Sequence, residues 1–201
     1  MDTKQRIIEQ ASGMFFKYGI RGITMDEIAE SLGMSKRTVY ESFSNKEELL
    51  QECIEYKYQE GKLLREDLLA QNPNDPLEVI RQHFRHVILA LNDLHPNFFN
   101  DMKKYHSRLW IEHIESKQEE NIEFTRNMIL TGIEKGVFRE SANPDILSRM
   151  IHQTMQMITL SDIFPESRYP RAEVVIQILF NFIRGLATPD GLNVLDQKFQ
   201  Q

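Results

Sequence analysis

The chain has 201 residues, of which 41% are hydrophobic and 27% charged, and its formal net charge at pH 7 is −6. This balance is ordinary for a globular chain of one or two domains with a sizeable core. No apolar run approaches the ~20 residues that a membrane span needs, and the N-terminus lacks the apolar core of an export signal. The single cysteine, Cys53, excludes an internal disulfide and is expected to be a buried, unreactive thiol. The sequence therefore predicts a cytoplasmic protein without a membrane segment.

The charge balance does not by itself indicate binding to nucleic acid. Residues 1–50 carry seven Lys and Arg against eight Asp and Glu. Binding would therefore depend on where a few basic side chains are placed, chiefly Lys36, Arg37 and Lys46. Weak non-specific binding and a strong reliance on dimerisation would follow.

The first predicted element is an amphipathic helix near the N-terminus, because apolar residues recur there at helical spacing. A second helix is predicted after Thr24, since Thr24 and Glu27 have the spacing of a capping box, in which two side chains satisfy free N–H groups at a helix start. Gly33 is expected to end this helix of about two turns, because glycine readily takes a positive φ. The apolar stripe of the first helix consists of Ile7, Ile8, Ala11, Met14, Phe15 and Tyr18.

The third predicted helix begins after Ser35, a favourable N-cap residue, and runs to Phe43. Two helices joined by a short turn that contains glycine have the spacing of a helix-turn-helix, whose second helix enters the major groove of DNA. Val39 and Phe43 can pack inward, which leaves the polar side chains for base edges and phosphates. The alternative reading is a small helical bundle with solvated charges. The outward residues are Lys36, Arg37, Thr38 and Tyr40.

A long helix is predicted from Ser44 to about Ala70, because Ser44 and Glu47 again have the spacing of a capping box. The free N–H groups at its start and at Thr24 suit a DNA phosphate, and Lys46 adds a positive charge there. This helix would join two domains without a flexible linker.

Residues 5–50 resemble the N-terminal domain of the TetR family of transcriptional repressors. The resemblance implies an all-α homodimer of about nine helices, with a three-helix helix-turn-helix domain at residues 1–48 and a larger helical ligand-binding and dimerisation domain at residues 49–201. It also implies that a small molecule bound in the second domain releases a palindromic operator. Ser42 stands where many members carry His, and Glu41 before it repels phosphate. The residues that carry the resemblance are Phe15, Gly19, Thr24, Ile28, Ala29, Gly33, Ser35, Thr38, Tyr40, Phe43, Lys46, Glu48 and Leu49.

The residues that we predict to contact operator DNA combine hydroxyl groups, basic groups and one aromatic ring at helix starts. They are Thr24, Ser35, Lys36, Arg37, Thr38, Tyr40 and Lys46.

Helix starts recur through the remaining chain, while strand signals are poor. Prolines and turn residues predict helices at about 76–94, 98–105, 106–116, onward to 135, 143–163 and 170–186. Gly136 is the expected C-cap of the fourth of these.

The last two predicted helices carry apolar stripes wider than one core contact requires, so we expect them to form a four-helix bundle across a two-fold axis. The alternative is that both helices are central to the core of one chain. The predicted interface residues are Leu147, Met150, Ile151, Thr154, Ile158, Val175, Ile178, Leu179, Phe182 and Leu186.

A ligand cavity between helices should be mostly apolar with a few polar groups. Aromatic residues and methionines cluster in the middle of the chain and would favour a flat or lipophilic molecule, although each residue taken singly is more often plain core. The predicted ligand-binding residues are Phe84, Ile88, Phe98, Phe99, Met102, Tyr105, His106, Trp110, Phe124, Met128 and Met155.

Two other functions remain open at this point. An all-helical enzyme or metal-dependent sensor could use the histidines of the middle region, since His83 and His86, and His106 and His113, share helix faces. No nucleophile elbow, phosphate loop or zinc-protease motif supports it, and we expect neither a cofactor nor a metal. A regulator that has lost control by a ligand is the second alternative.

Overall fold

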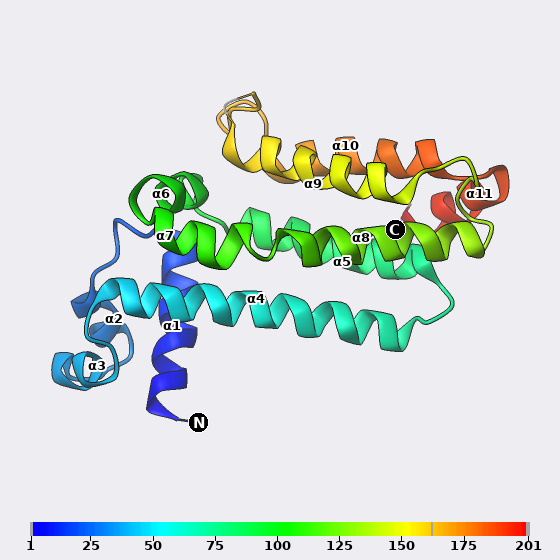
Figure 1. Ribbon diagram of the computed structural model, residues 1–201. Helices are drawn as coiled ribbons and strands as arrows, with labels where there is room; N and C mark the ends of the chain where they lie inside the picture. The colour runs from blue at the N-terminus through cyan, green and yellow to red at the C-terminus, as the bar shows by residue number, and fades with distance from the viewer. Residues whose placement is uncertain (1, 162, 200–201) are drawn as a thin grey trace. The chain divides into compact units, whose positions relative to one another are not determined.

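The computed structural model describes residues 2–161 and 163–199, and its regular elements within these ranges are all helices. They comprise eleven α-helices and one π-helical turn (Figure 1). The predicted all-α fold is confirmed. The count exceeds the nine helices that the family resemblance implied, because the region around residue 110 is broken and an additional helix follows residue 188. None of the described helices is long and apolar enough to cross a membrane.

The contacts divide the chain into two compact units. The first contains the residues up to Leu64 together with Asp93–Ser116, and the second contains Arg65–Asn92 together with the residues from Lys117 onward. The helix α4 (Lys46–Gln71) belongs to both units. These units are defined by contacts within the chain, whereas the domains expected from the sequence, 1–48 and 49–201, are defined by function.

The first unit begins with three helices, α1 (Thr3–Tyr18), α2 (Met25–Ser31) and α3 (Lys36–Ser42), followed by the first part of α4. Their apolar stripes meet in one core, as the helical spacing predicted, except that Tyr18, at the end of the predicted stripe of α1, is 56% exposed. Each large apolar side chain that is fully buried there stabilises the fold by about 1.5–3 kcal/mol relative to its exposed state. The fully buried side chains include Ile7, Ala11, Phe15, Ile28, Val39, Phe43, Leu49, Leu50 and Cys53.

The same unit contains three short elements from later in the chain: α6 (Phe98–Tyr105), α7 (Ser107–Trp110) and the π-helix η1 (Ile111–Glu115). The Phe98 ring lies 4.3 Å from the ring of Phe16 in α1. The backbone N–H of His95 donates to the carbonyl of Phe16 at 2.6 Å. Residues 93–116 therefore complete the core around α1, a role that the sequence pattern did not indicate.

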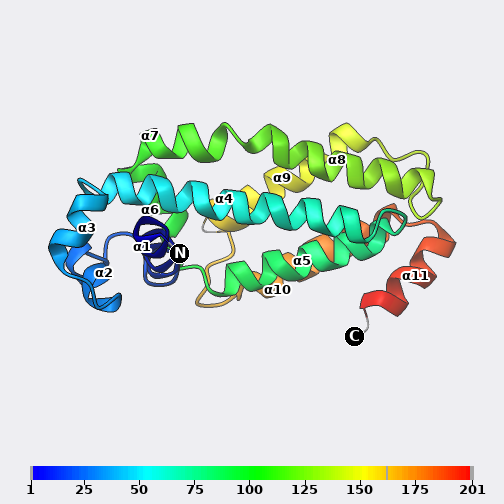
Figure 2. The same cartoon turned by 90° about the horizontal axis from the view of Figure 1, so that it is seen from below.

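The second unit contains α5 (Pro76–Asn92), α8 (Gln118–Glu134), α9 (Pro144–Leu160) and α10 (Arg171–Leu186). Helix α5 packs on α8 and α10, and α9 packs on the same two helices (Figures 1 and 2). Each helix therefore has two neighbours, and the four close into a bundle.

The last element, α11 (Pro189–Phe199), was not predicted. Thr188 caps its start by accepting a hydrogen bond from the N–H of Gly191 at 3.0 Å. The pattern Thr188-Pro189, an N-cap residue followed by proline at the first helical position, was the available signal. Lys198 attaches this helix to the start of α5 by ion pairs with Asp75 at 2.8 Å and with Glu78 at 3.2 Å.

Two local expectations were wrong. The cap of the long helix lies one residue later than predicted, at Asn45 and not at Ser44. The Oδ1 of Asn45 accepts from the N–H of Glu48 at 2.9 Å, and the Glu48 carboxylate accepts from the N–H of Ser44 at 2.7 Å. The helix expected at 106–116 is only four residues of α-helix before the backbone widens into η1. The expected glycine caps are confirmed, with φ of 62° at Gly33 and 70° at Gly136.

Candidate functional site

Helix α2 starts at the capping box that the sequence predicted, and this box is confirmed. The hydroxyl of Thr24 accepts from the N–H of Glu27 at 3.2 Å, and the Glu27 carboxylate accepts from the N–H of Thr24 at 2.7 Å. The Thr24 hydroxyl also donates to the Glu27 carboxylate at 2.8 Å, and this hydrogen bond, together with the one from the Thr24 N–H, lowers the pKa of Glu27. Thr24 is therefore held in one geometry at the helix start.

The turn after α2 fixes where α3 begins. Gly33 has the positive φ that the turn requires, and the N–H of Met34 donates to the carbonyl of Ala29 at 2.9 Å. Ser35 then caps α3, since its hydroxyl accepts from the N–H of Thr38 at 3.1 Å. Val39 and Phe43 are fully buried, so the opposite face of α3 is left in solvent.

That opposite face carries the predicted DNA contacts. The side chain of Arg37 is 86% exposed and that of Lys36 is 67% exposed. Tyr40 is exposed over 48% of its surface, and the hydroxyl of Thr38 lies 2.8 Å from that of Ser35. The structure thus brings these five residues to one helix start, in the arrangement that a major groove can accept.

Each basic side chain of α3 has an acidic partner within the chain. Arg37 pairs with Glu41 at 2.7 Å, one turn along the same helix, and Lys36 pairs with Asp26 of α2. Exposed pairs of this kind contribute little stability, so a phosphate or base can replace the carboxylate at small cost. The acids nevertheless lower the positive potential of this surface, in agreement with the weak charge of the segment.

Lys46 is less exposed than Lys36 and Arg37. Its amine sits 5.8 Å from the centre of the Phe15 ring, and the residue is half-buried. Burial lowers the pKa of Lys46, because it disfavours the charged ammonium. Its charge is placed beside the core of the first unit as well as at the start of α4.

A second candidate site is a cavity of about 340 Å³ inside the second unit. Its size is at the lower end of the range typical of small-molecule sites. The residues around it come from α4, α5, α8, α9, α10 and the turn at Phe138. The apolar lining residues are Ile80, Phe84, Val87, Phe124, Met128, Ile129, Phe138, Ile151, Met155, Leu179, Phe182, Ile183 and Leu186.

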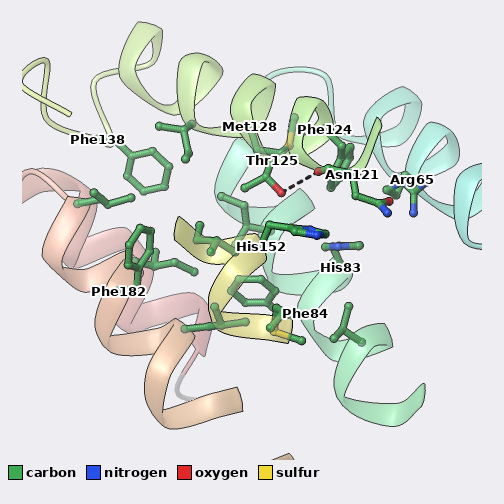
Figure 3. A pocket seen from close by; sticks show the side chains of 18 residues that line it. Arg65, His83, Phe84, Asn121, Phe124, Thr125, Met128, Phe138, His152 and Phe182 are labelled. Carbon is green, nitrogen blue, oxygen red and sulfur yellow. Dashed lines mark hydrogen bonds between the residues drawn. The ribbon is translucent and has the colours of Figure 1, made fainter. Parts of the chain in front are cut away.

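The polar lining residues gather toward one end of this cavity. Figure 3 shows Arg65, His83 and Asn121 together at one end, and Phe138 and Phe182 at the other. The remaining polar lining residues are Thr125, whose hydroxyl donates to the carbonyl of Asn121 at 3.2 Å, and His152, whose Nε2 lies 3.3 Å from the amide of Gln156.

His83 is the most constrained of these groups. Its Nδ1 is buried and has no hydrogen-bond partner among the described residues, while its ring lies 5.0 Å from that of Phe124. Burial, with smaller contributions from the charges of Arg65 and His86, lowers the pKa of His83 to about 4. The imidazole is therefore neutral at pH 7 and has an unused polar atom beside the cavity.

This shift predicts a loss of stability in mild acid. The unfolded histidine has a pKa near 6.5, so between pH 6.5 and 4 the unfolded chain takes up a proton that the folded chain does not. Stability should fall as the pH drops through this window, by roughly 3 kcal/mol at its acid end. Urea unfolding at pH 7, 6, 5 and 4 measures this loss.

The variant His83→Gln should reduce the pH dependence between pH 6.5 and 5, leaving the part that comes from His106 and His152, whose pKa values burial also lowers. The matched control is His86→Gln on the exposed side of the same helix, which should keep the slope of the original protein. Equal slopes for His83→Gln and the original protein would contradict the assignment.

The predicted ligand residues fall into three groups in the structure. Phe84, Phe124, Met128 and Met155 line the cavity. Ile88 lies in a second, more open groove between α5 and α10, which Phe84 shares. The others line neither space, because they pack in the first unit: Phe98, Phe99, Met102, Tyr105, His106 and Trp110.

The polar residues of the cavity were missed by the sequence reasoning, which followed aromatic clusters. The signal was present in α5, where Ile80, His83, Phe84 and Val87 recur at helical spacing and therefore share one face. No comparable signal marks Arg65, which lies on a long helix rich in charged residues.

The predicted dimer residues are also divided. Ile151, Leu179, Phe182 and Leu186 line the cavity, and Ile158 and Val175 are buried within the second unit. These six side chains therefore contribute to the interior of one chain. The more accessible members are Met150, which is 45% exposed, and Leu147, Thr154 and Ile178, which are half-buried.

The other chemical candidates are a metal site and a reactive thiol. No group of three or more His, Cys, Asp or Glu residues in the described part of the chain is arranged to hold a metal ion. Cys53 is buried as expected, with its thiol 3.6 Å from the carbonyl of Ile8. Burial raises the pKa of Cys53 to about 12, so the nucleophilic thiolate is absent at pH 7.

Residues 7–53 match the family model for "Bacterial regulatory proteins, tetR family". Among curated proteins, the transcriptional regulator YerO of Bacillus subtilis is 25% identical over 92% of this chain and 66% of its own length. The chain spans 56% of the length of a second regulator from that organism, YvaF. The repressor KstR2 of Mycobacterium tuberculosis is 24% identical over 74% of this chain and 75% of its own length.

Solved structures agree with the fold. The structure of a transcriptional regulator from Cytophaga hutchinsonii superposes with a TM-score of 0.72 over 92% of this chain and 98% of that one, at 20% identity. The matched family segment, 7–53, contains the helix-turn-helix surface, whereas the cavity lies outside it.

Proposed function

We propose that this chain, which belongs to the TetR family of bacterial regulatory proteins, is a dimeric transcriptional repressor that a small molecule releases from its operator. The observation that carries the proposal is the start of α3. There Ser35 caps the helix, Val39 and Phe43 hold it to the core, and Arg37 and Tyr40 extend into solvent. Such a helix start can reach base edges in a major groove.

In this proposal the seven predicted contacts share the work of DNA binding. Lys36, Arg37, Thr38 and Tyr40 face the groove, while Thr24, Ser35 and Lys46 meet phosphates near helix starts. The net charge of −6 gives no general attraction to DNA. Specific contacts and dimerisation must therefore supply the affinity, and binding without them should be weak.

The proposed dimer uses the second unit. Helix α9 exposes Ile146 and Met150 one turn apart, and α10 exposes Ile176. Exposed apolar side chains on neighbouring helices favour contact with another protein surface, and a two-fold partner offers the same residues in return. Two copies would present two α3 helices to a symmetric site, with half-sites about one helical turn or more apart.

The proposed control by a ligand depends on α4. This single helix begins next to α3, at Lys46, and carries Arg65 of the cavity further along. A ligand that binds one position of α4 better than another shifts the population of that position. Because such coupling is reciprocal, operator DNA should weaken ligand binding by the factor by which the ligand weakens DNA binding.

The test of the proposed function is whether the purified protein retains particular duplexes from a random pool. A folded protein that retains none of them would contradict it. Turnover of a substrate would then favour the enzyme alternative.

A further inference from the structure

We propose that the ligand of the cavity is an amphiphilic organic acid, held with its carboxylate toward Arg65 and His83 and its apolar body toward Phe138 and Phe182. This inference rests on the proposed function, in which the cavity of the second unit holds the controlling small molecule. It adds the chemical class and the orientation of that molecule.

The charge of the lining supports an anion. Arg65 is the cation among the described lining residues, and none of those residues is Asp or Glu. The guanidinium lies 5.7 Å from the centre of the Phe124 ring, which lines the same cavity. In apolar surroundings a positive charge attracts a carboxylate strongly and repels an ammonium group. The planar fork of arginine also matches the two oxygens of a carboxylate.

The Nδ1 atom of His83 also supports an acid at the end of the cavity where Arg65 lies. Its buried Nδ1 has no partner among the described residues, and leaving a buried polar atom unpaired costs about 1–3 kcal/mol. In the tautomer that protonates Nδ1, the ring donates to an acceptor such as a carboxylate oxygen. Burial, with a smaller contribution from the charge of Arg65, lowers the pKa of His83 and keeps the imidazole neutral, so the two groups would bind the acid as a cation and a neutral donor.

The opposite end of the cavity indicates the chemistry of the rest of the ligand. Phe138 and Phe182 lie there, with Ile183 and Leu186 beside them in the lining (Figure 3). This end offers an apolar surface that favours a hydrocarbon chain or ring system over a sugar or a peptide. One charged head and one apolar body are therefore the features that the two ends of the cavity recognise.

The test compares three probes with the same ten-carbon chain and different heads: decanoate, decan-1-ol and decylammonium. Their dissociation constants are measured by calorimetry on the full chain at pH 7, below the concentrations at which the probes aggregate. We expect decanoate to bind at least ~10-fold more tightly than decan-1-ol, and decylammonium to bind most weakly, since ~10-fold corresponds to one modest charge-assisted contact.

Arg65→Gln should remove the preference for decanoate while leaving the affinity for decan-1-ol within about two-fold, because it removes the charge and keeps most of the side-chain volume. The matched control is Arg85→Gln, an exposed arginine of α5 that borders the second groove and not the cavity. This control should keep the full preference.

Four outcomes would overturn the inference in different ways. Equal binding of decanoate and decan-1-ol, or a preference that survives Arg65→Gln, would contradict the proposal that the ligand is an acid bound by Arg65. The proposal that the cavity binds a ligand would stand. Loss of the preference in Arg85→Gln would mean that the acid binds in the groove between α5 and α10 and not in the cavity. Binding of none of the probes would contradict the proposed ligand cavity as well, whereas selection of duplex DNA tests the DNA-binding part separately.

Discussion

Replacing Arg37 by alanine should weaken binding to the operator by roughly 10- to 100-fold per half-site, which corresponds to the 1–3 kcal/mol of a good contact to a base. The side chain is 86% exposed at the start of α3, and its loss also leaves Glu41 unpaired where the DNA backbone would approach. Fluorescence anisotropy with a labelled operator at fixed salt measures the change. Stability should be nearly unaffected, since an exposed pair within one helix contributes about 0.3–0.5 kcal/mol.

Arg126→Ala is the matched control for this prediction. Arg126 is also a partly exposed arginine that bridges to an acid on its own helix, Glu123, but it lies in the second unit. Its replacement removes the same charge and should change operator binding by less than about two-fold, because Arg126 is not part of the helix-turn-helix. Equal losses in both variants would mean that net charge, and not the start of α3, governs binding.

Gly132→Ala should destabilise the protein by roughly 1–3 kcal/mol, the usual cost of overpacking a core. A Cβ at this position would clash with Cδ2 of Phe138, whose side chain is buried at the end of the cavity. The ring must move, and one direction open to it is the cavity that it lines. Thermal melting should show the loss, at about 2–4 °C per kcal/mol, and binding of decan-1-ol should weaken in parallel.

Gly185→Ala provides the control within the same unit. Nothing lies within 4 Å of a Cβ built there, and the residue is in helix α10. Alanine should therefore stabilise the helix by about 0.5–1 kcal/mol, because glycine loses more backbone entropy on folding. A Gly132→Ala protein as stable as the original would contradict the close packing of α8 against Phe138.

Local rules predicted helices α1, α2 and α3 well because their signals are short-range. The capping box of Thr24 and Glu27, the glycine turn at Gly33 and the cap at Ser35 each depend on residues three or four apart, and each is present in the structure. The error at α4 was of the same short range: Ser44 and Asn45 both suit a cap, and the hydrogen bonds select Asn45.

The cavity was harder to predict because it depends on which faces of distant helices meet. The aromatic cluster from Phe98 to Trp110 has the composition of a ligand site, but it packs around α1. The polar groups of the cavity come singly from separate helices, as Arg65, His83 and His152 do. Helical spacing identifies the apolar faces of α9 and α10, but it cannot distinguish a face turned to a cavity from one turned to a second chain.

The most direct test of the DNA-reading dimer is selection and sequencing of duplexes that the purified protein retains from a random pool at moderate salt. Sedimentation establishes beforehand that the protein is folded and records its mass in solution. Enrichment of a palindrome whose half-sites lie about one helical turn or more apart is the result that we expect, with enrichment lost in Arg37→Ala. If the folded protein enriches no sequence, or enriches a sequence without two-fold symmetry, the proposal that it binds DNA as a dimer would be contradicted.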